Sequence, residues 1–213
     1  MHRLPVGRTI LLFIATVLAW WWWSSRPVRH APGVLVPTPP QQEDQPPFAM
    51  GSVNDFRLTA FARYTLRGRV LGTKRYHGGV QSQLVPIDVA VGWGRMSDQG
   101  VLDRFSLTMG NRFFFYEWKG QPAVPPEEIQ RSAANNHVIA ANDEVEKAVR
   151  GLRVGQLVEM RGWLVDAEGP HGFRWRSSRR RDDSGNGACE LFLVEEARPL
   201  APAPSLAAKE TRP

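Results

Sequence analysis

Residues 154–165, VGQLVEMRGWLV, decide the fold. Apolar and polar side chains alternate along this segment, as in a half-buried β-strand, but the apolar ones change face partway, between Met160 and Trp163. One extra residue near Arg161-Gly162 explains the change, because a β-bulge sets two residues opposite one. The segment therefore predicts a long strand with a bulge in its middle.

Strands are also predicted on both sides of this segment. Residues 171–176 are expected to pair back on it as a hairpin. The other segments with the composition of strands are 61–76, 84–91, 112–118 and 188–195. The first of these contains Gly68 and Gly72, where we expect it to bend.

Two helices are predicted between the third and fourth of these strands. The first opens at Pro125-Pro126, since proline fits the first helical turn. It is expected to end at Asn135 and Asn136, because asparagine tolerates the left-handed conformation of a C-terminal cap. The second helix starts near Asp143, whose spacing to an acid three residues later resembles a capping arrangement.

Five strands with a helix between the third and fourth is the order of the OB-fold, a small Greek-key barrel. The sequence thus predicts a mainly β protein of the α+β class. Its domain is expected to be an OB-like, partly open β-barrel with inserted helices over residues 52–198, preceded by one N-terminal transmembrane helix.

The transmembrane helix is predicted from an uncharged stretch, residues 9–23, that ends in Trp20, Trp21, Trp22 and Trp23. Tryptophan prefers the membrane–water boundary, so these side chains are expected to form an interfacial anchor. Bulky residues occupy the positions where a signal peptidase needs small ones. We therefore predict an uncleaved signal anchor at 9–25 after a cytoplasmic tail at 1–8, with a cleaved signal and a buried core helix as alternatives.

The orientation of this segment is less clearly encoded, because arginines on its two sides nearly balance the positive-inside rule. A short N-terminal tail that stays inside is preferred. The expected location is the inner membrane, single-pass, with the globular domain periplasmic.

Proline-rich segments flank the domain. Residues 26–51 contain seven prolines and are predicted to form a semi-rigid polyproline II spacer. Residues 199–213 are rich in proline and alanine and are predicted to be disordered.

Charge and cysteine content exclude several function classes. The whole chain carries a net charge of +6, but six of its Lys/Arg and three of its acids lie outside residues 52–198, which leaves the domain at +3. This mild charge disfavours a dedicated nucleic-acid binder. Cys189 is the only cysteine, so neither an intramolecular disulfide nor a cysteine-based zinc site can form within one chain.

The domain also resembles a known family in several segments: LVPIDVAVGWGRMSD (84–98), RFFFYEW (112–118), SAANNHVIAAND (132–143), VGQLVEMRGWLV (154–165) and RWRSSRRRDDSGNGACELFLVEEA (174–197). Together they look like a family of bacterial, chiefly proteobacterial, proteins with one N-terminal membrane segment and no assigned activity. The resemblance implies a small membrane-anchored protein and supplies no catalytic residues.

A recognition surface, if there is one, is predicted to use Trp93, Asp98, Asn136, His137 and Arg176. Trp93 stands between glycines on a loop, where it either lines a ligand groove or plugs one end of the barrel. Arg176 belongs to a basic segment, residues 174–181, with Trp175 interleaved. Such a segment suits an anionic ligand or a stacked base, although the acids that follow it favour local ion pairs.

Two kinds of catalytic site are weighed and set aside. Cys189, His137 and an acid such as Asp88 would supply a nucleophile, a base and an orienting group. The sequence around Cys189 matches no cysteine-protease signature, so a buried structural thiol is preferred. The histidines show no HxH or HExxH spacing, so neither a metal nor a cofactor is expected.

The leading prediction is a non-enzymatic, membrane-anchored binding or assembly module outside the cytoplasm, with an envelope protein or an anionic ligand as partner. A membrane-anchored hydrolase that uses His137 with Cys189 or an acid is the first alternative. A single-strand nucleic-acid-binding OB module is the second.

Overall fold

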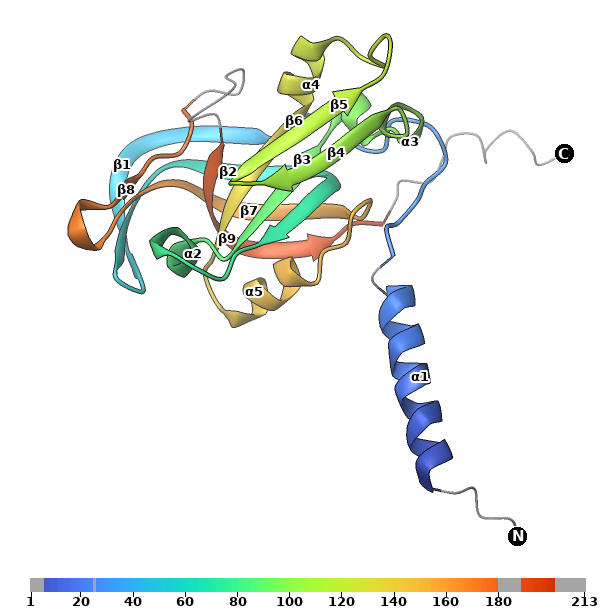
Figure 1. Ribbon diagram of the computed structural model, residues 1–213. Helices are drawn as coiled ribbons and strands as arrows, with labels where there is room; N and C mark the ends of the chain where they lie inside the picture. Colours follow the sequence, from blue (N-terminus) through green and yellow to red (C-terminus); the bar gives the residue numbers. More distant parts are fainter. Residues whose placement is uncertain (1–5, 25, 180–188, 202–213) are drawn as a thin grey trace, which may run out of the picture.

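The computed structural model describes residues 6–24, 26–179 and 189–201. Helix α1, Val6–Ser24, projects away from a body made mainly of β-strands (Figure 1). The mainly β class predicted from the sequence is confirmed.

Five strands of this body pair in a closed cycle. They are β2 (Phe56–Arg75), β3 (Ile87–Gly92), β6 (Ala133–Ala140), β9 (Glu190–Pro199) and β7 (Leu157–Glu168). Each pairs with the next, and β7 returns to pair with β2; only β6 and β9 run parallel. Two further strands extend the sheet, β1 (Gln41–Val53) beside β2 and β8 (Arg174–Trp175) beside β7 (Figure 1).

Two glycines allow the strands to bend into this cycle. A Cβ on Gly68 of β2 would lie 2.3 Å from Cγ1 of Val91, so only glycine lets β2 pass close to β3 there. In β7 the pairing with β9 shifts between Arg161 and Gly162, where a Cβ on Gly162 would lie 1.9 Å from the Leu193 carbonyl oxygen. The register thus breaks at the predicted place, but the extra residue is Glu195 of β9, because Arg161 pairs with Glu196 and Gly162 with Val194. The prediction of an extra residue within β7 itself is therefore wrong.

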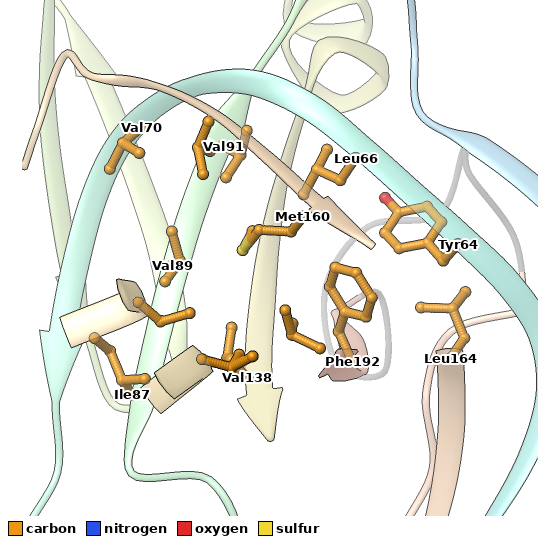
Figure 2. Packing of buried hydrophobic residues seen from close by; sticks show 14 of the residues in the cluster. Tyr64, Leu66, Val70, Ile87, Val89, Val91, Val138, Met160, Leu164 and Phe192 are labelled. Carbon is orange, nitrogen blue, oxygen red and sulfur yellow. The ribbon is translucent and has the colours of Figure 1, made fainter. Parts of the chain in front are cut away.

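The interior of the cycle is apolar. Figure 2 shows side chains from all five strands meeting there, including Leu66, Val89, Val138, Met160 and Phe192. The rings of Tyr64 and Phe192 pack edge to face, with centroids 5.0 Å apart. Because successive strand residues point to opposite faces, the outer face carries a second apolar cluster.

The connections between strands supply the helices. They are α2 (Val80–Leu84), the 3-10 turn η1 (Gly94–Ser97), α3 (Gln99–Leu102), α4 (Pro126–Ser132), α5 (Asp143–Arg150) and the 3-10 turn η2 (Pro170–Gly172). In chain order, β6 and β7 are the third and fourth strands of the cycle, and helix α5 lies between them, as predicted. Its cap is Asn142, whose side chain accepts from the Val145 amide at 2.9 Å, rather than Asp143.

Two sequence predictions around β6 are wrong. Asn135 and Asn136 lie in β6 and do not cap the preceding helix, which ends at Ser132. The segment predicted as the third barrel strand forms β5 (Phe113–Trp118), which pairs with β4 (Phe105–Gly110) in a separate two-stranded sheet. Residues 84–91 also divide, because Leu84 ends α2 before β3 begins.

The spacer predicted at 26–51 differs from the structure in its second half, which forms most of β1. Its prolines are accommodated because Pro46 and Pro47 fall in an irregularity between the Asp44 and Phe48 pairs. Proline cannot donate to a ladder and is tolerated at such an edge. The first half also packs on the domain: the Val28 amide donates to Val154 at 2.7 Å, and Val36 is buried.

The predicted transmembrane helix needs correction. A helix does form at residues 6–24, but among the described residues no helix has both the length and the apolar character needed to cross a membrane. The side chains of Trp20, Trp22 and Trp23 are exposed. Of the predicted C-terminal tail, residues 202–213 lie outside the described residues.

Candidate functional site

The structure separates the five predicted recognition residues. Trp93 is buried in the interior cluster, and its amide donates to the Ser132 carbonyl at 2.9 Å. This agrees with the alternative in which Trp93 plugs the barrel. The Asp98 carboxylate accepts from the amides of Gly100 and Gly33, each at 2.8 Å, so it caps α3 and holds the N-terminal segment. Neither residue lines the site described below.

Asn136 faces the interior of the barrel together with Val138 and is fully buried. Its side-chain amide donates to the Val89 carbonyl at 3.1 Å. Asn136 therefore stabilises the β3–β6 pair and does not lie in a ligand site.

His137 and Arg176 do come together. They line a pocket of about 280 Å³ on the outer face of β3 and β6, which we call the histidine pocket. Its lining residues come from α2, from the β4–β5 turn, from β6 and from the β7–β9 connection: Gln81, Asn111, Arg112, Phe113, His137, Trp175, Arg176 and Cys189.

Asp88 organises the floor of this pocket. Its side chain is fully buried, and Oδ1 lies 2.9 Å from Nδ1 of His137 and 2.9 Å from Nη1 of Arg112. An ionised carboxylate only accepts hydrogen bonds, so Nδ1 carries the proton in this contact. In the neutral ring, Nε2 is then left as the acceptor that can serve the pocket.

Aromatic rings pack against Arg112 and His137 in the pocket wall. The guanidinium of Arg112 lies 3.7 Å from the ring centroid of Tyr76, whose hydroxyl accepts from the Arg112 amide at 3.0 Å. Burial raises the pKa of Tyr76, and the nearby Asp88 carboxylate acts in the same direction, so the phenol stays neutral. The ring of His137 packs on Trp175 with centroids 4.7 Å apart. Each of the two side chains is therefore held by an aromatic ring as well as by Asp88.

Cys189 is half-buried at the edge of the same pocket. Its Sγ lies 3.9 Å from the Arg112 carbonyl oxygen and 3.8 Å from Nδ2 of Asn135. The structure thus brings together the three residue types of the predicted catalytic alternative, Cys189, His137 and Asp88. In the described ranges, no three His, Cys, Asp or Glu side chains gather as metal ligands.

The basic segment after β8 is largely held by acids of β7. Arg179 pairs with Asp166, and its guanidinium lies 3.4 Å from the ring centroid of Phe61. Arg174 lies 3.8 Å from Glu168. The predicted local pairing with Asp182 and Asp183 falls outside the described residues. Among its described arginines, Arg174 and Arg179 therefore lie beside acids of β7, whereas Arg176 lines the histidine pocket.

Sequence reasoning missed Arg112, Tyr76 and Gln81 as members of the site. One signal was available: Asn111 and Arg112 form the tip between two strands, and both have positive φ, 50° and 68°. An Asn at such a tip predicts a tight hairpin. No sequence signal showed that this tip folds over His137.

Comparison of the chain with protein-family models, with curated proteins and with solved structures finds no match. The resemblance to membrane-anchored bacterial proteins stays a prediction.

Proposed function

We propose that this chain is an OB-like ligand-binding module and that the histidine pocket binds a small anionic group. Three features support the assignment to the OB class. They are the cycle of five strands, the parallel pairing of β6 and β9, which are the third and fifth of these strands in chain order, and the position of α5. OB-folds bind ligands on the face of their second and third strands, between the first–second and fourth–fifth connections. In this chain these elements are β3, β6, the connection that holds α2, and the connection that holds Trp175.

The observation that carries the proposal is the coincidence of the histidine pocket with that face. The pocket lining contains Arg112 and Arg176, a histidine and two side-chain amides. The Asp88 carboxylate beneath it is already bound to Arg112 and His137, which leaves Arg176 without an acid in the lining. Trp175 adds a flat apolar wall. A carboxylate or phosphate attached to a planar or apolar body would match these groups. With about 280 Å³, the pocket holds one small group, which favours the end of a ligand over a continuous nucleic-acid strand.

Ligand-detected NMR with small aromatic carboxylates and phosphate esters tests this proposal. Binding should be lost in Trp175→Ala and weakened in Arg112→Lys, which keeps the charge but not the planar donor geometry. Arg57→Gln is the control, because Arg57 is exposed and pairs with Glu168 away from the pocket. Equal binding by all three variants would place the ligand elsewhere.

The hydrolase remains a second candidate because of one observation: Asp88 orients His137 in the same pocket that Cys189 lines. A general base must lie within reach of the nucleophile it activates, and an orienting acid must hold it there. Thiol labelling, described in the Discussion, separates this candidate from the binding module.

We further propose that α1 attaches the module to a membrane, with the domain outside the cytoplasm. The apolar side chains of α1 whose exposure the structure describes lie largely open, including Leu11, Phe13 and Leu18. The guanidinium of Arg26 lies 3.5 Å from the ring centroid of Trp22, an arrangement suited to the lipid headgroup region. Replacing Trp20, Trp22 and Trp23 by serine should reduce flotation with lipid vesicles. Unchanged flotation would contradict this attachment.

A further inference from the structure

A second cavity lies on a different face of the barrel, across β1, β2 and β7. It has a volume of about 360 Å³, and we call it the arginine pocket. It is lined by Thr38, Pro39, Gln41, Arg63, Thr65, Arg67 and Arg161. Gln41, Thr65 and Arg161 stand in one row, since Thr65 pairs with both of the others in register. Their side chains point outward, because Tyr64 and Leu66 between them on β2 point into the core.

One buried carboxylate, that of Glu159, pairs with the guanidinium groups of Arg67 and Arg161. The side chain of Glu159 is 0% exposed and accepts from Nε of Arg67 and from Nε of Arg198 at 2.9 Å. It also forms an ion pair with Arg161, whose Nη2 lies 3.0 Å away. Burial by itself raises the pKa of Glu159, but the hydrogen bonds from Arg198 and Arg67 outweigh burial and lower it overall. Glu159 is therefore ionised at neutral pH, and a single negative charge faces three positive ones.

Arg67 and Arg161 keep positive charge and N–H donors that a ligand in the arginine pocket can use. A guanidinium has five N–H groups, and the contacts of Arg67 and Arg161 with Glu159 use only some of them. Nε of Arg161 is buried and has no hydrogen-bond partner among the described residues. Arg63 pairs with Glu195 at 2.6 Å through Nη1. Glu43 stands opposite Arg63 in register, but it does not line the pocket.

The regular pairing of β7 with β2 sets the position of Arg161. Glu159, Arg161 and Trp163 stand opposite Arg67, Thr65 and Arg63 in an unbroken register. On its other side, β7 approaches β9 closely, since a Cβ on Gly162 would lie 1.9 Å from the Leu193 carbonyl oxygen. The two neighbouring strands thus hold Arg161 in the row that it shares with Thr65 and Gln41.

We propose that the arginine pocket is a binding site for a phosphate group, either free or as the headgroup of a lipid. Three arginines without an acid in the lining match the charge of a phosphate, and their planar forks match its oxygen geometry. The hydroxyls of Thr38 and Thr65 and the amide of Gln41 add neutral donors. The site is separate from the histidine pocket and does not depend on the function proposed for it.

The first arm of the test is calorimetric titration of the full-length chain, in a nonionic detergent, with inorganic phosphate. We expect saturable binding that Arg161→Gln weakens about 10- to 100-fold, as for the loss of hydrogen bonds to a charged group. Arg57→Gln removes an exposed arginine from the same pair of strands and should change the affinity less than about 2-fold. If Arg161→Gln does not fold, Arg63→Gln, at an exposed pocket position, replaces it.

The second arm separates a lipid source from free phosphate. Flotation with phosphatidylcholine vesicles is compared with flotation after phosphatidic acid is added. A gain on adding phosphatidic acid that is lost in Arg161→Gln and kept in Arg57→Gln supports a lipid headgroup. Saturable binding of inorganic phosphate with the same mutational pattern supports a free phosphate. The proposal is overturned if neither probe binds, or if both variants bind as the unmodified chain does.

Discussion

The histidine pocket and the arginine pocket each lie next to a buried carboxylate, but the two carboxylates have different roles. Asp88 holds one arginine and one histidine under a cover of aromatic rings, and its Oδ2 has no hydrogen-bond partner in the described part of the chain. Glu159 is surrounded by three arginines that remain 39–58% exposed. The first arrangement orients a largely buried imidazole, whereas the second concentrates positive charge on arginines that are partly exposed.

The largest expected effect comes from Asp88→Asn, which keeps the shape of the side chain but removes its charge. Arg112 is only 13% exposed, so it would lose its counter-charge in a largely buried position. Breaking a buried pair in this way costs about 3–5 kcal/mol of unfolding free energy. Urea unfolding measures the loss.

Asp103→Asn is the matched control for this variant. It removes the partner of Arg29 in an exposed pair, whose side chains are 69% and 45% exposed, and should cost less than about 1 kcal/mol. Similar losses in the two variants would contradict the greater contribution assigned to the buried Asp88–Arg112 pair.

The next effect concerns Gly162, which follows Arg161 in β7 and packs closely on β9. Gly162→Ala would place a Cβ 1.9 Å from the Leu193 carbonyl oxygen, so β7 and β9 must separate. Such overpacking costs about 1–3 kcal/mol, and phosphate affinity should fall with it, because Arg161 is the neighbouring residue. Gly110→Ala is the control, because a Cβ there meets nothing within 4 Å. An unchanged phosphate affinity in Gly162→Ala would show that the proposed site does not depend on this close packing.

Much of the difference between the two pockets could not be predicted from the sequence, although much of the barrel could. Residues 154–165 predicted β7, because alternation is a local property, but the extra residue of the bulge lies in the partner strand, at Glu195 of β9. The OB-like strand order was predicted with residues 112–118 as the third strand, whereas β6 is the third strand of the cycle in the structure. The aromatic run 112–118 has a stronger strand composition than β6, whose Asn135 and Asn136 resemble a helix end. Only tertiary hydrogen bonds, such as that from Asn136 to Val89, make β6 a strand.

The sites were predicted less well than the barrel, because they join distant segments. His137 and Arg176 were predicted and do share a pocket, and Asp88 was suggested as the partner of His137. Trp93 and Asp98 are absent from its lining, since the loop that carries them packs on the N-terminal segment. The arginine pocket was not foreseen, because its residues alternate along two ordinary strands and become a cluster only when β2 and β7 pair.

A smaller effect is expected in the pH dependence of stability. The pKa of Glu159 is lowered in the folded chain, so its ionised form stabilises the fold above the unfolded pKa of about 4.3, and this contribution is lost as the pH falls below that value. Glu159→Gln should therefore cost about 1–2 kcal/mol at pH 7 and progressively less below pH 4, since the arginines around it remain partly solvated. Urea unfolding at several pH values measures the difference.

Glu168→Gln is the control for this dependence, because Glu168 is 54% exposed and pairs with Arg57 at the surface. Its effect should stay within about 0.5 kcal/mol at every pH. A difference between Glu159→Gln and the unmodified chain that grows on acidification would contradict the assigned charge state.

The smallest expected effect concerns Cys189 and decides how the histidine pocket works. In a binding module the thiol needs no activation, and a thiol reagent should label the native chain slowly at neutral pH and rapidly only after unfolding. Cys189→Ser should then cost about 1 kcal/mol, because it places a hydroxyl in a half-buried position, and should leave ligand binding intact.

If Cys189 is instead the nucleophile of a hydrolase, its thiol must be activated in the native chain. His137 would have to take its proton, and native labelling would be rapid and lost in His137→Gln. Gln is the sharper replacement, since it keeps a donor for Asp88 but cannot serve as a base. Rapid labelling that depends on His137 would therefore turn the same carboxylate–imidazole pair from a recognition element into a catalytic one.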